Sequence, residues 1–148
     1  MPIPSFNEHG LLPEGVHDCS LEEIEARFGA FQGSERRPEL RLRLKEFLRE
    51  AKASGIVLAI LINGSFVTAT PDPNDIDVIV VVPASHDYAR DLRPAEYDVV
   101  SKLRVRRRYG FDLLLARAGS VELARYTAFF QQVRFAPFER KGILRIVL

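Results

Sequence analysis

The chain of 148 residues has one cysteine, no tryptophan and no long apolar run. Cys19 has no partner for a disulfide within the chain and leaves no thiolate cluster for zinc, which excludes a disulfide scaffold. The longest apolar run, Ile56 to Ile62, is far shorter than the roughly 18 residues of a membrane-spanning helix. The first residues also lack the basic and apolar regions of a secretory signal, so we expect a protein of the reducing cytoplasm with no membrane contact.

Two further patterns are missing. No motif of the form G-x-x-x-x-G-K-[ST] occurs, which excludes a Walker-type NTPase, and no repeat of roughly 20–50 residues indicates a solenoid. The composition, 47% hydrophobic and 28% charged residues, is that of a globular protein. We expect a single domain over residues 1–148, in which residues 1–19 form an extended arm punctuated by proline and glycine.

Basic residues are scarce in the first part of the chain, and acidic residues are scarce in the last part. Residues 1–100 contain 10 basic and 17 acidic side chains, a net charge of −7, whereas residues 101–148 contain 11 and 3, a net charge of +8. The charge of the whole chain is only +1. Such an asymmetry indicates an anionic partner at one surface.

The spacing of apolar residues predicts alternating helices and strands. A capping-box pattern at Ser20 and Glu23 predicts a helix over 20–28, and apolar spacing predicts a second helix from Pro38 to Gly55. Later elements are expected to be strands over 56–62 and 76–82, a helical stretch over 85–108, a strand over 111–116, a helix over 121–131 and a strand over 143–148. The alternation implies an α/β or α+β domain built on one sheet.

Two carboxylates interrupt the second apolar strand. Asp75 and Asp77 are two residues apart, so in a strand their side chains project to the same face about 6.6 Å apart at Cα. Their mutual repulsion and desolvation would be costly unless a cation lay between them. Hard oxygen ligands of this kind suit Mg²⁺.

Asp112 is a third acidic residue in an apolar strand. A neighbouring strand could bring it to the Asp75 and Asp77 face, and three convergent carboxylates can bridge two metal ions about 3.5–4 Å apart. Gly64, which has no Cβ, would let backbone amides approach an oxyanion, and Ser65 adds a hydroxyl donor at the same turn. Taken alone, Gly64 and Ser65 are more typical of an ordinary turn between a strand and a loop than of a phosphate site.

Together, Gly64-Ser65, the later Asp75-Ile76-Asp77 and the strand with Asp112 resemble the DNA polymerase β-like nucleotidyltransferase superfamily. The resemblance covers about residues 38–116. The N-terminal and C-terminal segments also resemble a small, uncharacterised bacterial family related to the nucleotidyltransferases of toxin–antitoxin systems. The resemblance implies a mixed sheet of about four to five strands with helices packed mainly on one face.

The same resemblance implies residue roles. Gly64 and Ser65 would hold the β and γ phosphates of ATP or another NTP, and Asp75 and Asp77 would bind Mg²⁺ or Mn²⁺. Asp112 would complete the catalytic metal site and help to deprotonate the acceptor hydroxyl. The loop after Ser65 lacks the further glycine or basic residue found in small members, and Asn74 stands where they carry a serine.

These observations predict a nucleotidyltransferase that transfers a nucleoside monophosphate from an NTP to a hydroxyl of an unidentified protein, RNA or small molecule. The alternative is a non-catalytic, antitoxin-like module that binds a partner protein, such as a toxin, on the same scaffold. A basic run near the third carboxylate is either a solvated helix face or a patch for triphosphate or RNA phosphates; it comprises Arg104, Arg106, Arg107 and Arg108. Larger members of the superfamily grip the base or the acceptor with a further helical domain, and a homodimer could supply that wall of the site here.

Overall fold

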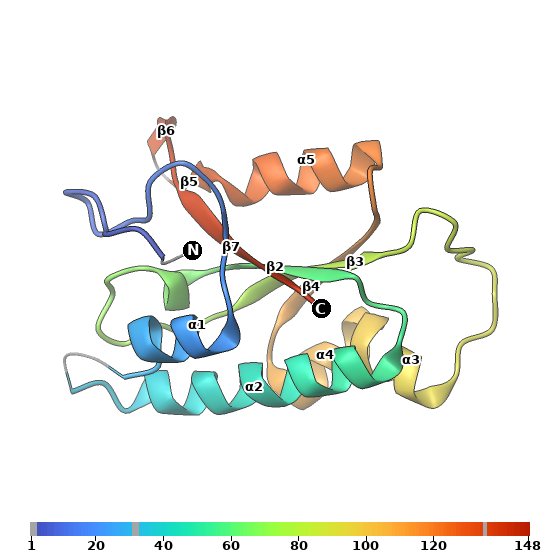
Figure 1. Ribbon diagram of the computed structural model, residues 1–148. Helices are drawn as coiled ribbons and strands as arrows, with labels where there is room; N and C mark the ends of the chain where they lie inside the picture. Colours follow the sequence, from blue (N-terminus) through green and yellow to red (C-terminus); the bar gives the residue numbers. More distant parts are fainter. Residues whose placement is uncertain (1–2, 31–32, 135) are drawn as a thin grey trace.

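The computed structural model describes residues 3–30, 33–134 and 136–148, and its centre is a five-stranded mixed sheet (Figure 1). The outer pairs β1–β7 and β3–β4 are parallel, whereas β7–β2 and β2–β3 are antiparallel. In spatial order the strands are β1 (Gly15–Asp18), β7 (Gly142–Val147), β2 (Ala59–Asn63), β3 (Asp77–Val82) and β4 (Asp112–Arg117).

Helices cover both faces of this sheet unequally. One face carries α1 (Leu21–Phe28), α2 (Arg36–Ser54), α3 (Pro94–Val100) and α4 (Lys102–Tyr109), and the other face carries α5 (Val121–Phe130) (Figure 1). The predicted α+β class, with a mixed sheet and helices mainly on one face, is therefore confirmed. No helix in the described ranges is long and apolar enough to cross a membrane.

The central strands are buried from both sides, which explains their uninterrupted apolar runs. Ile60 and Ile62 of β2 pack in the larger core beneath α1–α4, whereas Leu61 packs in the smaller core beneath α5. The same alternation continues in β3, where Val80 and Ile79 face opposite cores. Because both faces of these strands are buried, apolar residues do not alternate with polar ones as they do in a strand with one exposed face.

The helix boundaries follow their local signals. Ser20 caps α1, since its hydroxyl accepts from the Glu23 amide while the Glu23 carboxylate accepts from the Ser20 amide. Helix α2 ends at Gly55, whose φ of 77° is favourable only for glycine and a few other residues. Pro94 occupies the first turn of α3, where its missing N–H costs nothing.

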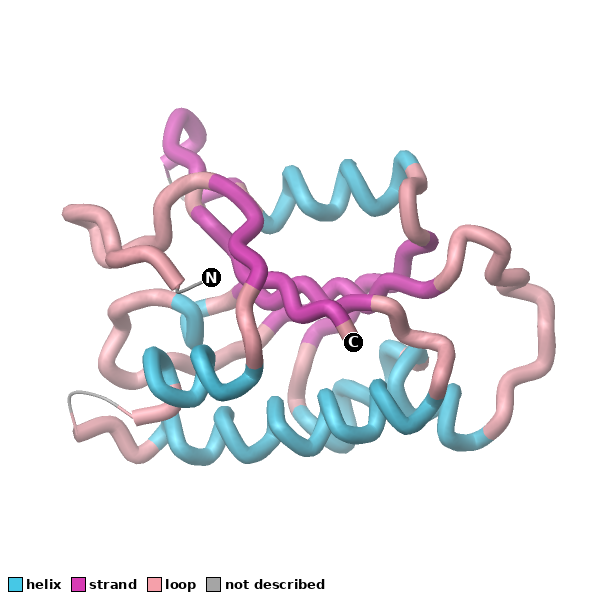
Figure 2. The backbone as a smooth tube through the Cα atoms, in the orientation of Figure 1, coloured by secondary structure: helices cyan, strands magenta, loops and turns pink. Residues whose placement is uncertain are grey.

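Three expectations for these elements are corrected. The predicted helical stretch begins only at Pro94, because residues 84–93 form turns and extended chain (Figure 2). The predicted arm contributes a strand, β1, whose short polar sequence pairs in parallel with the edge of β7. A small hairpin of β5 (Gln132–Val133) and β6 (Ala136–Arg140) follows α5, where the sequence analysis predicted no strand.

Candidate functional site

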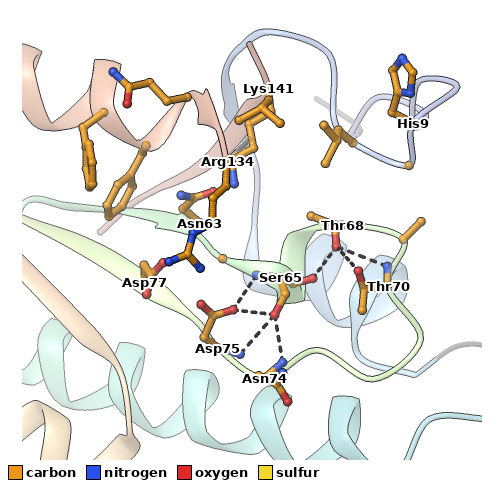
Figure 3. Close-up of a pocket in the computed structure, with 18 residues that line it drawn as sticks. His9, Asn63, Ser65, Thr68, Thr70, Asn74, Asp75, Asp77, Arg134 and Lys141 are labelled. Carbon is orange, nitrogen blue, oxygen red and sulfur yellow. Dashed lines mark hydrogen bonds between the residues drawn. The ribbon is translucent and has the colours of Figure 1, made fainter. Parts of the chain in front are cut away.

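A cleft of about 940 Å³ opens where β2 ends and β3 begins (Figure 3). Its floor contains the loop that follows β2 and the residues that precede β3. One wall is the arm at His9–Leu11, and another is the end of α5 together with the β5–β6 hairpin. Besides His9 and Gly64, the lining includes the polar or charged residues Asn63, Ser65, Thr68, Thr70, Asn74, Asp75, Asp77, Gln132, Arg134 and Lys141.

Gly64 is required by the close approach of two backbone segments. Its φ is 103°, and a Cβ at this position would lie 2.7 Å from the carbonyl oxygen of Asp75. The amide of Phe66, two residues further on, donates a hydrogen bond to the same carbonyl over 3.2 Å. The glycine therefore lets the turn after β2 lie directly against the approach to β3.

Ser65 positions Asp75. The Ser65 amide and hydroxyl both donate to Asp75 Oδ1, over 2.8 and 2.5 Å, and the hydroxyl oxygen accepts from the amides of Asn74 and Asp75. These bonds use the hydroxyl that the sequence analysis assigned to a phosphate. Ser65 thus orients the first carboxylate, and its hydroxyl already donates to Asp75.

Arg37, which sequence reasoning missed, holds the rest of this loop. Its guanidinium is fully buried at the start of α2 and donates to the carbonyl oxygens of Phe66, Thr68 and Thr70, as well as to that of Phe28. Burial lowers the pKa of Arg37 to about 10, so the side chain stays charged at neutral pH. In the sequence Arg37 looks like Arg36 and Arg41, which are only half-buried on the same helix, and its tertiary contacts alone distinguish it.

Asp75 and Asp77 lie on the same side of the chain, as predicted, but only Asp77 belongs to β3. Asp75 precedes the strand and is exposed, whereas Ile76 between them is fully buried in the larger core. Burial, followed by the charges of Asp75 and Asp112, raises the pKa of Asp77 to about 6. A cation beside Asp77 would relieve this cost.

Asp112 lies next to Asp77 but does not line the cleft. The two residues are direct partners in the parallel β3–β4 ladder. The Asp112 side chain is 66% exposed and forms an ion pair with Arg106 of α4. Among the described residues, no three of His, Cys, Asp or Glu are grouped closely enough to hold a metal ion, so the predicted carboxylate trio is adjacent but not assembled.

The donors that line the cleft nevertheless fit a hard divalent cation. Asn63, the β2 partner of Asp77, has a buried Oδ1 with no hydrogen-bond partner among the described residues. An unsatisfied buried oxygen beside a desolvated carboxylate is an arrangement that a cation would complete. Asn63, Asp75 and Asp77 are thus the residues that could hold Mg²⁺ or Mn²⁺.

Two cations of the cleft were also missed from the sequence. Arg134 and Lys141 come from the β5–β6 hairpin and its junction with β7, and Figure 3 shows both on the side of the cleft above Asn63 and Asp77. Burial lowers the pKa of Lys141, while the charges of Asp77 and Asp75 counteract this effect. The sequence offered one weak signal for Lys141 as a site residue: it is the one lysine after Lys102 in the basic last part of the chain.

The basic run lies on α4, and most of it pairs with acidic side chains. Arg104 bonds to Asp98, Arg106 to Asp112, and Arg108 to Glu50 and Asp98. Arg107 is exposed and has no ion pair within the described ranges. Ion pairs of this kind are typical of a solvated helix face, and phosphate or RNA binding through this run stays a prediction.

Comparison with curated proteins found no match. Comparison with solved structures found none either. A family model, described as a family of unknown function (DUF6932), matches residues 4–147, and the chain belongs to this family.

Proposed function

We propose that the cleft is the active site of a Mg²⁺-dependent nucleotidyltransferase. The observation that carries the proposal is the convergence of Gly64-Ser65, Asp75 and Asp77 at one end of the sheet, with Asp112 directly beside Asp77. A structural role alone does not explain Asp77, since the fold disfavours its ionised form and leaves Asn63 Oδ1 unsatisfied next to it.

Each residue has a defined task in such a reaction. Gly64 keeps side-chain bulk away from the loop above the carboxylates, and Ser65 holds Asp75 in place. Asp75, Asp77 and Asn63 would hold the metal, which when bound polarises the α-phosphate and neutralises the leaving pyrophosphate. Asp112, which lies beside Asp77 but outside the cleft lining, would accept the proton of the acceptor hydroxyl once its side chain separates from Arg106.

The proposed transfer needs only the NTP and the acceptor as reactants. The acceptor oxygen bonds to the α-phosphorus, the bond from that phosphorus to the β-phosphate oxygen breaks, and pyrophosphate leaves with the electron pair. The cleft of about 940 Å³ is large enough for a nucleoside triphosphate. Phe129, which is 60% exposed at one wall, offers a face on which a nucleobase could stack.

Metal-dependent nucleotide binding tests this proposal. Each NTP is titrated into the wild type, Asp75→Ala and Asp77→Ala with Mg²⁺ or with EDTA, and heat of binding is recorded. We expect the wild type to bind NTP with Mg²⁺ but not with EDTA, and both variants to bind at least tenfold more weakly than the wild type with Mg²⁺. Asp91→Asn, in the exposed, irregular segment before α3, is the matched control and should bind like the wild type.

The alternative, an antitoxin-like module, has a different outcome in the same experiment. Such a module would bind no NTP under any condition and would retain its partner protein in Asp75→Ala and Asp77→Ala. That pair of results would overturn the enzymatic proposal.

A further inference from the structure

The loop between Ser65 and Asp75 contains no lysine or arginine, yet a polyphosphate needs cations. The cations of this cleft come instead from the far end of the chain, at Arg134 and Lys141. Both line the same space as Asp75 and Asp77, and in Figure 3 the Arg134 side chain extends past Asn63 toward Asp77.

The backbone holds Lys141 at this position. Its amide donates to the carbonyl of Gln131 over 2.9 Å, which ties the start of β7 to the end of α5. The β2–β7 ladder ends at the pair of Ile62 and Leu144, and Lys141 lies three residues before Leu144, where β7 starts at the cleft.

The arm secures the same junction from the other side. The amide of Gly142 donates to the carbonyl of Leu12 over 2.9 Å, and a Cβ on Gly142 would lie 2.1 Å from the carbonyl oxygen of Pro13. Contacts from two distant segments therefore place Lys141 beside the carboxylates, so its presence in the cleft is built into the fold.

The charges of the cluster are balanced. Asp75, Asp77 and Asp112 carry three potential negative charges, and Arg106, Arg134 and Lys141 carry three positive charges around them. A lone Mg²⁺ meets the repulsion of the lysine and arginine, and a lone polyphosphate meets the repulsion of the aspartates. A metal–polyphosphate complex brings both signs and can satisfy both sets of groups.

Building on the proposed function, we propose that Lys141 and Arg134 exchange partners when substrate binds. Without substrate, the two cations lie on the side of the cleft above Asp77 and share its lining with both aspartates (Figure 3). With a metal–polyphosphate complex bound, the carboxylates hold the metal, and Lys141 and Arg134 hold the phosphate oxygens. The substrate class is thus a metal-bound polyphosphate, and the two cations select it over either ion alone.

If the cations exchange partners, removing the charge of Lys141 should strengthen the binding of a free metal ion and weaken the binding of a metal–polyphosphate complex. In Lys141→Met, free Mn²⁺ measured by electron paramagnetic resonance should reveal Mn²⁺ binding about threefold tighter than in the wild type, because a competing cation is gone. Inorganic tripolyphosphate with Mg²⁺, titrated by calorimetry, should bind about tenfold more weakly, because a charged phosphate contact is gone. Arg134→Met should change both affinities in the same directions.

Two controls separate this exchange from a general structural effect. Lys141→Arg keeps the charge and should restore most of the tripolyphosphate affinity, and Lys45→Met, on the exposed surface of α2, should change neither affinity. Weaker Mn²⁺ binding by Lys141→Met, or unchanged tripolyphosphate binding, would overturn the exchange even if Asp77→Ala abolishes NTP binding. Opposite shifts without any nucleotidyl transfer would instead support the exchange and contradict the proposed reaction.

Discussion

At the scale of single residues, the site contains a charged group whose burial costs folding free energy. Asp77 is the clearest example, because burial and two neighbouring carboxylates raise its pKa to about 6. In the unfolded chain the pKa of this carboxyl lies near its ordinary value of 3.8, so the folded state binds the proton more tightly. Ionised Asp77 therefore destabilises the fold, a cost that a cation-binding role explains.

Asp77→Asn should consequently stabilise the metal-free protein. In EDTA at pH 8 we expect a gain of about 1–2 kcal/mol in the free energy of unfolding, measured by urea denaturation. The gain should be negligible well below the ordinary carboxyl pKa of 3.8, grow as the pH rises toward about 6, and then stay constant, because only the wild type acquires the unfavourable charge. Destabilisation by Asp77→Asn at pH 8 would contradict this account, and Asp91→Asn serves as the neutral comparison.

Arg37 is also a buried charge, but its two terminal nitrogens donate to four backbone carbonyl oxygens. Arg37→Leu would leave the carbonyls of Phe66, Thr68 and Thr70 without this donor. We expect a loss of about 3–5 kcal/mol in the free energy of unfolding and a loosened cleft loop. Arg49→Leu, which removes an exposed ion pair with Glu46, should leave the urea midpoint nearly unchanged in the same denaturation experiment.

At the scale of elements, the turn from β2 into the cleft loop depends on glycine for space as well as for conformation. In Gly64→Ala the new Cβ would meet the Asp75 carbonyl, whereas in Gly119→Ala it would meet no atom within 4 Å, although the Gly119 φ is also positive, at 69°. Gly64→Ala should therefore cost at least about 2 kcal/mol in thermal unfolding, and Gly119→Ala only about 1 kcal/mol. Equal losses for the two variants would show that the close approach to Asp75 carries no energetic weight.

The elements that the sequence predicted well are those that carry their own signals. Continuous apolar runs located β2 and β3, and a capping box located α1. Strand β1 and the β5–β6 hairpin were missed because they are short and polar, and their strand character depends on a partner that is remote or irregular. The extension of helix into residues 85–93 failed because a polar stretch without apolar spacing favours no particular element.

At the scale of the whole molecule, the cleft is assembled from the two ends of the chain around a central motif. Four of the residues predicted from the sequence, Gly64, Ser65, Asp75 and Asp77, line one cleft. Asp112 lies beside Asp77 in the sheet but outside the cleft lining. Asn63, Arg134 and Lys141 were not predicted as site residues, because their relation to the carboxylates arises only when β2, β7 and the hairpin pack. This arrangement explains the asymmetry of charge along the chain, because the basic last part folds back onto acidic residues of the first part.

The most direct test of the central claim is transfer of label from each α-³²P-labelled NTP, with Mg²⁺, to protein, RNA or small molecules of a cell extract. We expect one labelled product class with the wild type and Asp91→Asn, release of pyrophosphate in equal amount, and no labelled product with Asp77→Asn. The absence of label transfer from every NTP with a folded wild type, or equal transfer by wild type and Asp77→Asn, would contradict a nucleotidyltransferase site in this cleft.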